Sequence, residues 1–354
     1  MSRELVVNGI RIADDTDCFV IAEIGHNHQG NVDTCKKLFV AAKEAGFSAV
    51  KLQKRDNRSL YTKAVFDQPY HSENAFGGTY GSHREALEFG WDEYSELQQF
   101  AKELDILFFA TAFDEASADF LMELDVPAIK IASGDLRSVQ LLEYVARLGR
   151  PMFVSTGGAE MSDVERAYDT IMPINPALCL LQCTAAYPPD WGNLDLGVID
   201  TFRSRFPDIV IGFSSHDSGI AMAAVAFALG ARVVEKHFTL NRAMRGTDHA
   251  FSLEPTGGRK LVRDLQRARE AMAVSTKRLH PVETMALEKM GKRMVAAADL
   301  PAGHVLRRED IAMKSPGNGM WPHQLPEVLG RALTKPIALD DTISPDILAS
   351  QGER

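Results

Sequence analysis

The chain has 354 residues, of which 45% are hydrophobic and 25% are charged, and its formal net charge is -9. The length suits one barrel-sized domain plus a small one, and the composition is that of an ordinary globular protein. The acidic balance argues against a nucleic-acid-binding protein, while the lack of a signal peptide and of a membrane-length apolar run predicts a cytoplasmic protein that does not bind membranes.

Eight apolar runs rich in β-branched residues recur along the chain. These predicted strands lie at residues 19–25, 49–54, 106–113, 128–133, 151–157, 178–184, 210–216 and 233–239. Helical patterns lie between or after them, at residues 31–45, 91–103, 116–124, 139–148, 162–172, 196–206, 219–229 and 257–273. Near-continuous apolar strands that alternate with helices are typical of a parallel sheet covered by helices. Eight such units favour an α/β fold of the (β/α)8 TIM-barrel type over a Rossmann-like sheet, since no GxGxxG follows the first strand.

The connection after the second predicted strand is unusually long. Residues 55–89 are rich in His, Tyr, Asn and Gly. Long connections in compact domains are usually functional or disordered, and the aromatic content argues against disorder. Because this connection leaves the carboxyl end of a strand, where barrel enzymes carry their sites, we expect it to cover the substrate.

Two of the last strands end in a histidine, His216 and His237. The segment between them, residues 218–230, is rich in alanine and ends at a glycine, as a helix would. A strand–helix–strand unit returns the second strand parallel and usually adjacent to the first. Both histidines then lie at the same edge of the sheet, which favours a metal or catalytic pair over two unrelated polar strand ends.

Charged and hydroxyl side chains accumulate at the same ends of the predicted strands. Burying an unpaired ammonium group is costly, so Lys51 and Lys130 within apolar runs indicate an anionic ligand. Three serines either end strands or donate to a phosphate: Ser133, Ser155 and Ser214. Two carboxylates could be acids, bases or partners of the lysines: Glu23 and Glu235. The pattern predicts a divalent metal ion and a small phosphorylated anion inside a barrel.

The last part of the chain changes character. Residues 275–293 are polar and basic, and we place the domain boundary there, with a catalytic domain at residues 1–280, a linker at 281–292 and a small module at 293–354. Short apolar runs separated by Gly or Asp-Asp predict that this module is rich in β structure. Its core is thin, so we expect it to lean on the barrel or on a partner subunit.

A series of motifs in this order resembles the N-acetylneuraminate (sialic acid) synthase family. They are Ile21-Ala-Glu-Ile-Gly-His-Asn-His-Gln-Gly30, Lys51-Leu-Gln53, Lys130-Ile-Ala-Ser-Gly-Asp135, Ser155-Thr-Gly157, Gln182-Cys-Thr-Ala-Ala-Tyr-Pro188, Gly212-Phe-Ser-Ser-His216 and Glu235-Lys-His-Phe238. The C-terminal module, with Asp299-Leu-Pro-Ala-Gly303 and Pro316-Gly-Asn-Gly319, is similar to the antifreeze-like (SAF, β-clip) domain of that family. The resemblance covers essentially the whole chain and implies a homodimer in which this domain swaps over the partner's active site.

The resemblance also implies a reaction and its residues. Phosphoenolpyruvate would condense with an unphosphorylated N-acyl-hexosamine or hexose to a nine-carbon 2-keto-3-deoxy sugar acid and phosphate, by C–O cleavage. The metal ion would be Mn2+, with Mg2+ or Co2+ as alternatives, and its ligands would be His216 and His237. The catalytic residues carried over are Glu23, which would position or deprotonate the water, Lys51, Lys130, Glu235 and Asp248. Phosphoenolpyruvate would contact Lys51, Thr111, Lys130, Ser133, Ser155 and Ser214. The sugar would contact Gln53, Asn74, Tyr187, Asp248 and Ser315.

Two positions depart from the pattern of bacterial members of the family. Ala185 stands where they have Asn, and Ser315 stands where they have an Arg that reaches the partner's site and touches the N-acetyl group. Both changes remove polar contacts from the sugar end. We therefore expect an acceptor other than N-acetylmannosamine, either a differently substituted hexose or a diacetamido sugar leading to legionaminate- or pseudaminate-type acids.

Two other functions are considered. A synthase of the octulosonate-phosphate kind would act on a phosphorylated sugar and would need a second phosphate site, for which residues 55–89 offer Arg55, Arg58, Lys63 and Arg84. A non-enzymatic sugar- or ice-binding protein would use the barrel as a scaffold. The catalytic residue types at the strand ends argue against this last function.

Overall fold

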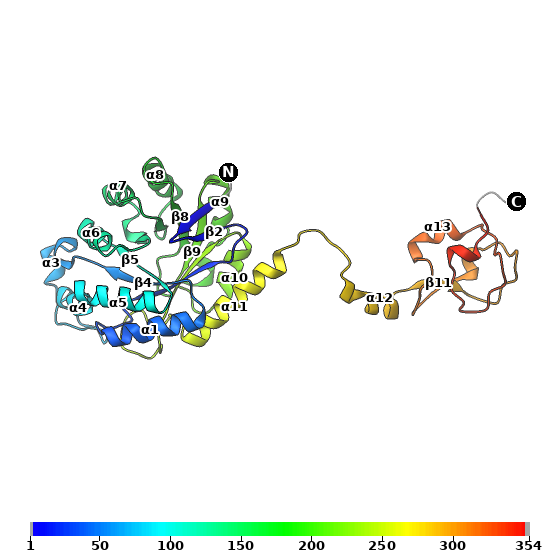
Figure 1. Ribbon diagram of the computed structural model, residues 1–354, viewed down its shortest axis with the longest axis horizontal. Helices are drawn as coiled ribbons and strands as arrows, with labels where there is room; N and C mark the ends of the chain where they lie inside the picture. Colours follow the sequence, from blue (N-terminus) through cyan, green and yellow to red (C-terminus); the bar gives the residue numbers. More distant parts are fainter. Residues whose placement is uncertain (1–2, 351–354) are drawn as a thin grey trace. The chain divides into compact units, whose positions relative to one another are not determined.

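Eight parallel strands close into a barrel in the computed structural model, which describes residues 3–350 (Figure 1). The strands are β3 (Phe19–Gly25), β4 (Ala49–Lys54), β5 (Leu107–Ala112), β6 (Ile129–Ile131), β7 (Met152–Ser155), β8 (Leu178–Cys183), β9 (Val210–Ser215) and β10 (Val233–His237). Their order around the barrel is β10, β3, β4, β5, β6, β7, β8, β9. The predicted (β/α)8 barrel is confirmed. An antiparallel hairpin of β1 (Glu4–Val7) and β2 (Ile10–Ala13) precedes it.

Helices follow the strands and cover the outside of the barrel. The principal ones are α1 (Val32–Ala45), α5 (Trp91–Glu103), α6 (Glu115–Glu123), α7 (Val139–Arg147), α8 (Met161–Ile171), α9 (Val198–Arg205), α10 (Ala221–Ala228) and α11 (Pro255–Met272). Local signals fix their ends. At α1 the Asn31 side chain accepts a hydrogen bond from the Thr34 N–H, and Gly46 ends the helix at φ 89°.

Stacked aromatic rings fill the barrel interior beneath the polar strand ends. Phe153 on β7 stacks on Phe19 of β3 and on Phe109 of β5, with ring centroids 6.0 Å and 5.5 Å apart. None of these strands is a neighbour of another, so the contacts cross the interior. Side chains two residues apart in a strand share a face, so Thr111 and Ser155 also point inward, above the aromatic layer. The apolar layer thus supports a polar one at the carboxyl end.

The long connection after β4 contains three short helices. They are α2 (Asn57–Leu60), α3 (Lys63–Phe66) and α4 (Tyr80–Leu87). Glu88 ties the two ends of the connection together, because its carboxylate accepts from Lys54 Nζ at 2.8 Å and from the Arg55 N–H at 3.1 Å. The connection is therefore an ordered excursion of residues 55–88 at the carboxyl end of β4.

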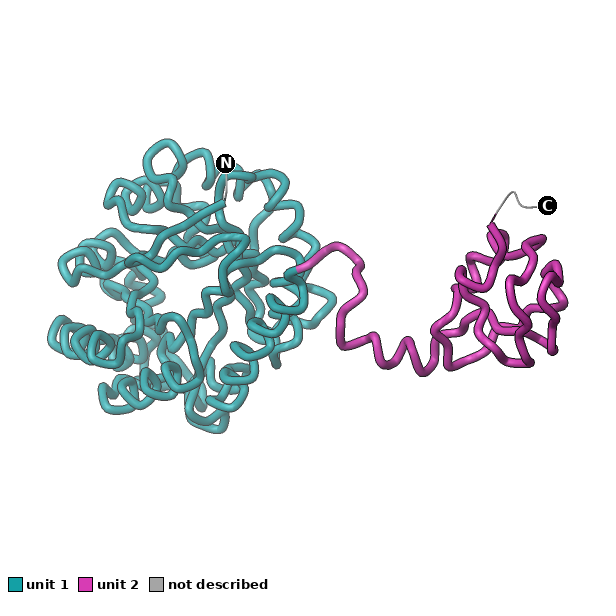
Figure 2. Tube along the Cα trace, turned by 45° about the vertical axis from the view of Figure 1, so that its right-hand side comes forward, with its two compact units in different colours: residues 1–273 teal, residues 274–354 magenta. Residues whose placement is uncertain are grey.

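Residues 274–354 form a second compact unit, separate from residues 1–273 (Figure 2). It contains α12 (Thr284–Met290), an antiparallel pair of β11 (Arg293–Ala296) and β12 (Ile311–Lys314), and α13 (Leu325–Val328). Met294, Leu306 and Ile343 lie in its own small core. α12 occupies most of the stretch predicted to be a linker. The antiparallel strands agree with the predicted β-rich module.

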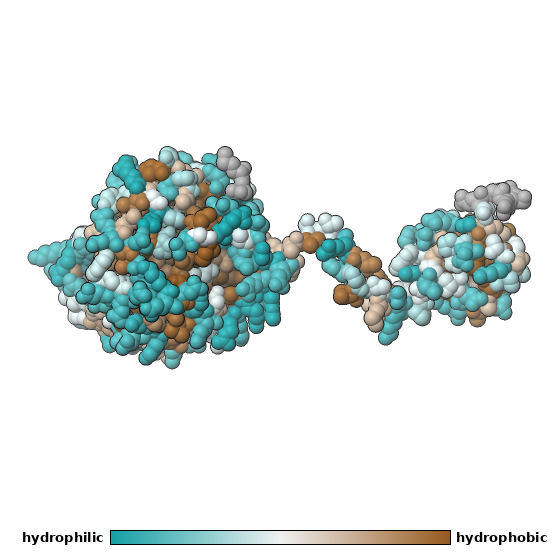
Figure 3. All heavy atoms as spheres, viewed as in Figure 1, coloured by the Kyte–Doolittle hydropathy of each residue, from teal (hydrophilic) through white to brown (hydrophobic). Residues whose placement is uncertain are grey.

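Apolar side chains gather on the segment that carries α12 (Figure 3). Val282 is 88% exposed and Met285 is 82% exposed. Among residues 3–350, no helix is both long enough and apolar enough to cross a bilayer.

Gly212 on β9 occupies a position where a Cβ atom has no room. A Cβ there would lie 2.7 Å from the Val233 carbonyl oxygen and would also clash with Leu181. We expect Gly212→Ala to lower the free energy of unfolding by about 1–3 kcal/mol, because the barrel must shift to admit the methyl group. Denaturant titration measures this. Gly192→Ala, where a Cβ meets no atom within 4 Å, is the matched control, and equal stability of the two variants would contradict the close packing.

Candidate active site

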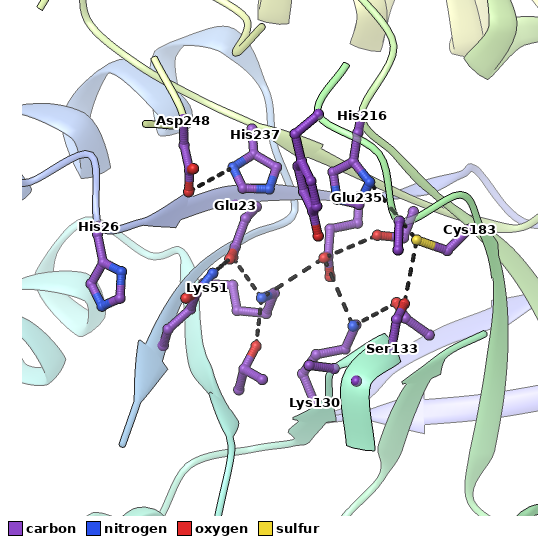
Figure 4. A pocket seen from close by; sticks show the side chains of 18 of the residues that line it. Glu23, His26, Lys51, Lys130, Ser133, Cys183, His216, Glu235, His237 and Asp248 are labelled. Carbon is purple, nitrogen blue, oxygen red and sulfur yellow. Dashed lines mark hydrogen bonds and ion pairs between the residues drawn. The ribbon is translucent and has the colours of Figure 1, made fainter. Parts of the chain in front are cut away.

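A cavity of about 440 Å³ lies at the carboxyl ends of the barrel strands (Figure 4). Most of the predicted site residues line it: Glu23, Lys51, Gln53, Thr111, Lys130, Ser133, Ser155, Tyr187, Ser214, His216, Glu235, His237 and Asp248. Strand register explains why they meet. Glu23 on β3 pairs with Lys51 on β4, and Glu235 on β10 pairs with Ser214 on β9. Residues in register at one end of a closed barrel face one space.

Lys51 is buried and anchored by groups on the two neighbouring strands, β3 and β5. Its ammonium nitrogen lies 2.6 Å from Glu23 Oε2, and it donates to Thr111 Oγ1 at 2.7 Å. The second Glu23 oxygen accepts from Gln53 Nε2 at 2.6 Å. The side chains of Lys51 and Glu23 are both only 2% exposed, so each charge depends on the other for compensation.

Lys130 forms a second, parallel arrangement on the other side of the cavity. It donates to Ser155 Oγ at 2.6 Å and lies 3.9 Å from Glu235 Oε1. Glu235 Oε1 also accepts from Ser214 Oγ at 3.3 Å and lies 3.8 Å from Lys51 Nζ. Two buried ammonium groups thus face two buried carboxylates, and each ammonium group also holds a hydroxyl. A small anion that displaced part of this network would find two cations already in place.

The pKa values of the two buried carboxylates, Glu23 and Glu235, are shifted in opposite directions. Burial raises the pKa of Glu23 to about 6, against the opposing effect of Lys51. Burial also acts on Glu235, but Lys130 and Lys51 outweigh it and lower the pKa of that group. Glu235 is therefore a fixed negative charge, whereas Glu23 can exchange a proton near neutral pH.

His216 and His237 lie side by side with ring centroids 5.3 Å apart. His216 Nδ1 lies 2.9 Å from the Thr184 carbonyl oxygen, which can only accept, so Nδ1 carries the proton and Nε2 keeps a free lone pair. Burial lowers the pKa of His237, which favours the neutral form that binds metals, and its Nδ1 lies 3.7 Å from Asp248 Oδ2 without a hydrogen-bond partner. Between residues 3 and 350, no group of three or more His, Cys, Asp or Glu side chains could hold a metal ion. Water or substrate would therefore have to complete the coordination of a metal ion held by these two histidines.

Two predicted sugar-binding residues lie outside the cavity lining. The Asn74 side chain accepts from the Gly246 N–H at 2.9 Å, so it holds the loop that carries Thr247 and Asp248 into the cavity. Ser315 belongs to the second compact unit, where its hydroxyl donates to the Met290 carbonyl oxygen at 2.9 Å. Direct contact of either side chain with a sugar stays a prediction.

Further residues line the cavity, including two arginines that the sequence offered only for the second phosphate site of an octulosonate-type synthase. His26, Arg55 and Arg84 line the cavity together with Cys183, whose pKa is lowered because the adjacent His216 outweighs the effect of burial. Arg55 directly follows a strand, so its place at the barrel mouth could be predicted. Arg84 lies at the far end of the long excursion, and its spacing in the chain carries no such signal.

Comparisons with known proteins identify the family of the chain. The NeuB family matches residues 38–277, and the SAF domain matches residues 294–349. The chain is 39% identical over 338 residues to human "N-acetylneuraminate-9-phosphate synthase", covering 95% of this chain and 94% of that protein. It is 32% identical over 344 residues to "N,N'-diacetyllegionaminic acid synthase" of Legionella pneumophila, covering 95% and 96% of the two chains. A crystal structure of "N-acetylneuraminic acid (Sialic acid) synthetase" from Leptospira borgpetersenii superposes with a TM-score of 0.71 at 30% identity, covering 81% of this chain and 96% of that one.

The raised pKa of Glu23 makes the stability of the protein depend on pH. The folded protein binds this proton more tightly than the unfolded chain, so the contribution is full below the usual value of 4.5 and is lost as the pH rises through about 6. We expect the free energy of unfolding of Glu23→Gln, relative to the native protein, to increase over this window by up to about 2 kcal/mol. Denaturant titrations at several pH values measure it. A difference that stays constant or decreases would contradict the raised pKa.

Proposed function

The chain belongs to the NeuB family, and from that premise we propose that it condenses phosphoenolpyruvate with a hexosamine-type sugar to a nine-carbon 2-keto-3-deoxy sugar acid and phosphate. As a member of this family, the chain is a phosphoenolpyruvate-dependent transferase. The observation that carries the proposal is the buried pair of lysines, each with a hydroxyl partner, beside two adjacent histidines in one cavity.

Phosphoenolpyruvate has two anionic ends, and the cavity has two cationic positions for them. We assign the phosphate to Lys130 with three hydroxyl groups around it, those of Ser133, Ser155 and Ser214. We assign the carboxylate to Lys51 and Thr111, whose side chains already lie 2.7 Å apart. Preformed positions of this kind hold the reacting atoms without further ordering and stabilise the departing phosphate.

A divalent metal ion, Mn2+ with Mg2+ or Co2+ as alternatives, is proposed to bind His216 and His237. When bound, such an ion polarises a carbonyl oxygen and so makes the sugar aldehyde more electrophilic. Asp248 beside His237 and Tyr187 beside His216 would contact the sugar close to this point, and Gln53 would contact it from β4.

The proposed reaction needs only water as a further reactant. Carbon 3 of phosphoenolpyruvate attacks the aldehyde carbon, which forms the new C–C bond, and the aldehyde oxygen takes up a proton. Water then adds to carbon 2 and gives a proton to Glu23, whose raised pKa suits a base at neutral pH. The C2–O bond to the bridging oxygen then breaks, the hydroxyl on carbon 2 loses its proton to become the ketone, and the bridging oxygen leaves with phosphate, which takes up that proton. Glu235 stays charged and offsets both lysines.

For the acceptor sugar and for the oligomeric state, the proposal is less specific. The human relative is named for a 9-phosphate product, whereas the name of the Legionella relative carries no phosphate, so the printed names support both a phosphorylated and an unphosphorylated acceptor. A domain-swapped homodimer is supported by the exposed apolar residues around α12, such as Val282 and Met285, which a partner subunit would cover. The cytoplasmic location stays a prediction.

Phosphate release from phosphoenolpyruvate tests the proposal. We expect the metal-stripped protein with Mn2+ restored to release phosphate with at least one acceptor among N-acetylmannosamine, its 6-phosphate, mannose and a 2,4-diacetamido-trideoxyhexose. His237→Ala should lower the rate by at least about 100-fold, because loss of a metal ligand exceeds the usual cost of losing an outer partner.

His280→Ala changes an exposed histidine in the second compact unit and serves as the control that should retain the rate. Release with arabinose 5-phosphate alone would assign the protein to the octulosonate class. No release with any of these sugars would contradict the proposed reaction.

A further inference from the structure

Two arginine side chains reach the cavity without a carboxylate partner. Arg55 directly follows β4 and Arg84 lies on α4, and both line the cavity. Neighbouring glutamates are engaged elsewhere, since Glu88 pairs with Lys54 at 2.8 Å and Glu85 pairs with Arg58 at 2.9 Å. Within residues 3–350, no carboxylate forms an ion pair with either guanidinium group of the cavity.

Hydrogen-bond donors outnumber acceptors around these arginines. His26 lies between them, with Arg55 Nη1 3.2 Å from its Nε2 and Arg84 Nη1 3.4 Å from its Nδ1. Burial and the two arginines keep the pKa of His26 well below its usual value, so the ring is neutral and has one lone pair. One guanidinium N–H therefore faces a ring N–H. In addition, Arg55 Nε is buried and has no hydrogen-bond partner, and the residue as a whole is only 7% exposed. An anion would supply the missing acceptor.

Surrounding groups hold both guanidinium planes in place. Arg55 donates to Gln53 Oε1 at 2.7 Å and lies over the Phe113 ring at 3.6 Å. Arg84 donates to the Tyr80 hydroxyl through two nitrogens, at 3.0 Å and 2.8 Å. Tyr80 and Arg84 share α4, so the excursion of residues 55–88 delivers one arginine and the end of β4 delivers the other. Preorganised guanidinium groups bind phosphate with little ordering cost.

This cluster lies apart from the position assigned to the phosphate of phosphoenolpyruvate. His26 lies on one side of Glu23 and Asp248, and Lys130 and Ser133 lie on the other (Figure 4). Gln53 connects the two regions, since it accepts from Arg55 and donates to Glu23 at 2.6 Å. An extended acceptor whose aldehyde lies near the histidine pair could therefore place its far end at the arginines.

We propose that Arg55, Arg84 and His26 bind a terminal phosphate of the acceptor sugar, so that the preferred acceptor is a hexosamine 6-phosphate. The inference rests on the proposed function and selects between the two acceptor classes considered there. Each guanidinium group can donate to two phosphate oxygens, and among the described residues that line the cavity no other offers a cation on that side. A neutral sugar hydroxyl could accept one hydrogen bond here, but it would bring no negative charge to the two guanidinium groups.

Paired acceptors test the inference in the full-length protein with Mn2+ restored. We expect kcat/KM for N-acetylmannosamine 6-phosphate to exceed that for N-acetylmannosamine by about 100-fold, since charge-assisted hydrogen bonds add together. Arg84→Gln should lower kcat/KM for the phosphorylated sugar by about 10- to 100-fold, while the KM for phosphoenolpyruvate changes by less than about threefold. Arg58→Gln, an exposed arginine of the same excursion, should change neither value.

The possible outcomes separate this inference from the proposed function. Equal or better use of the unphosphorylated sugar, or a matching rise in the KM for phosphoenolpyruvate in Arg84→Gln, would overturn the arginine site while leaving the reaction intact. If neither sugar supports phosphate release, the proposed function fails, and calorimetric titration with N-acetylmannosamine 6-phosphate decides the site alone. Unchanged affinity in Arg84→Gln would overturn it.

Discussion

Mutual compensation of buried charges is the constraint on which the site depends. Lys51 and Lys130 could not remain charged inside a barrel without Glu23 and Glu235, and removing one partner leaves an uncompensated charge at a cost of several kcal/mol. The closed sheet brings strand ends from many parts of the chain to one point. The stacked phenylalanine layer beneath them closes the interior, so the polar groups face a cavity and not the core.

The strand and helix pattern was sufficient to predict the barrel, and strand ends were sufficient to predict most of the cavity. Lys51, Lys130, His216 and His237 stand at the ends of apolar runs, where a parallel sheet fixes their position. The helices of the excursion after β4 could not be predicted from the sequence, because α2 to α4 are too short to show a helical period. Arg84 was named only as one of four cations available for a second phosphate site, because its place in the cavity depends on how that excursion folds, not on a strand end.

Positive and negative charges balance at the centre of the cavity, whereas positive charge is in excess at its edge. Around Glu23 and Glu235 the positive and negative charges match, so a substrate that binds there must exchange partners with the protein. At the edge, Arg55 and Arg84 form no ion pair with a carboxylate of residues 3–350, and the buried Arg55 Nε lacks an acceptor there. Phosphoenolpyruvate at the centre and an acceptor with a terminal phosphate at the edge would satisfy both regions, and this difference would orient the two substrates before any bond changes.

The fate of the bridging oxygen tests the central claim most directly. Phosphoenolpyruvate carrying 18O between carbon 2 and phosphorus would be turned over with an acceptor sugar, and both products would be weighed by mass spectrometry. Cleavage of the C–O bond predicts that the released phosphate keeps the label and that the new ketone takes its oxygen from water. Label retained in the sugar acid would mean that the P–O bond breaks, which would contradict the addition of water at carbon 2 beside Glu23.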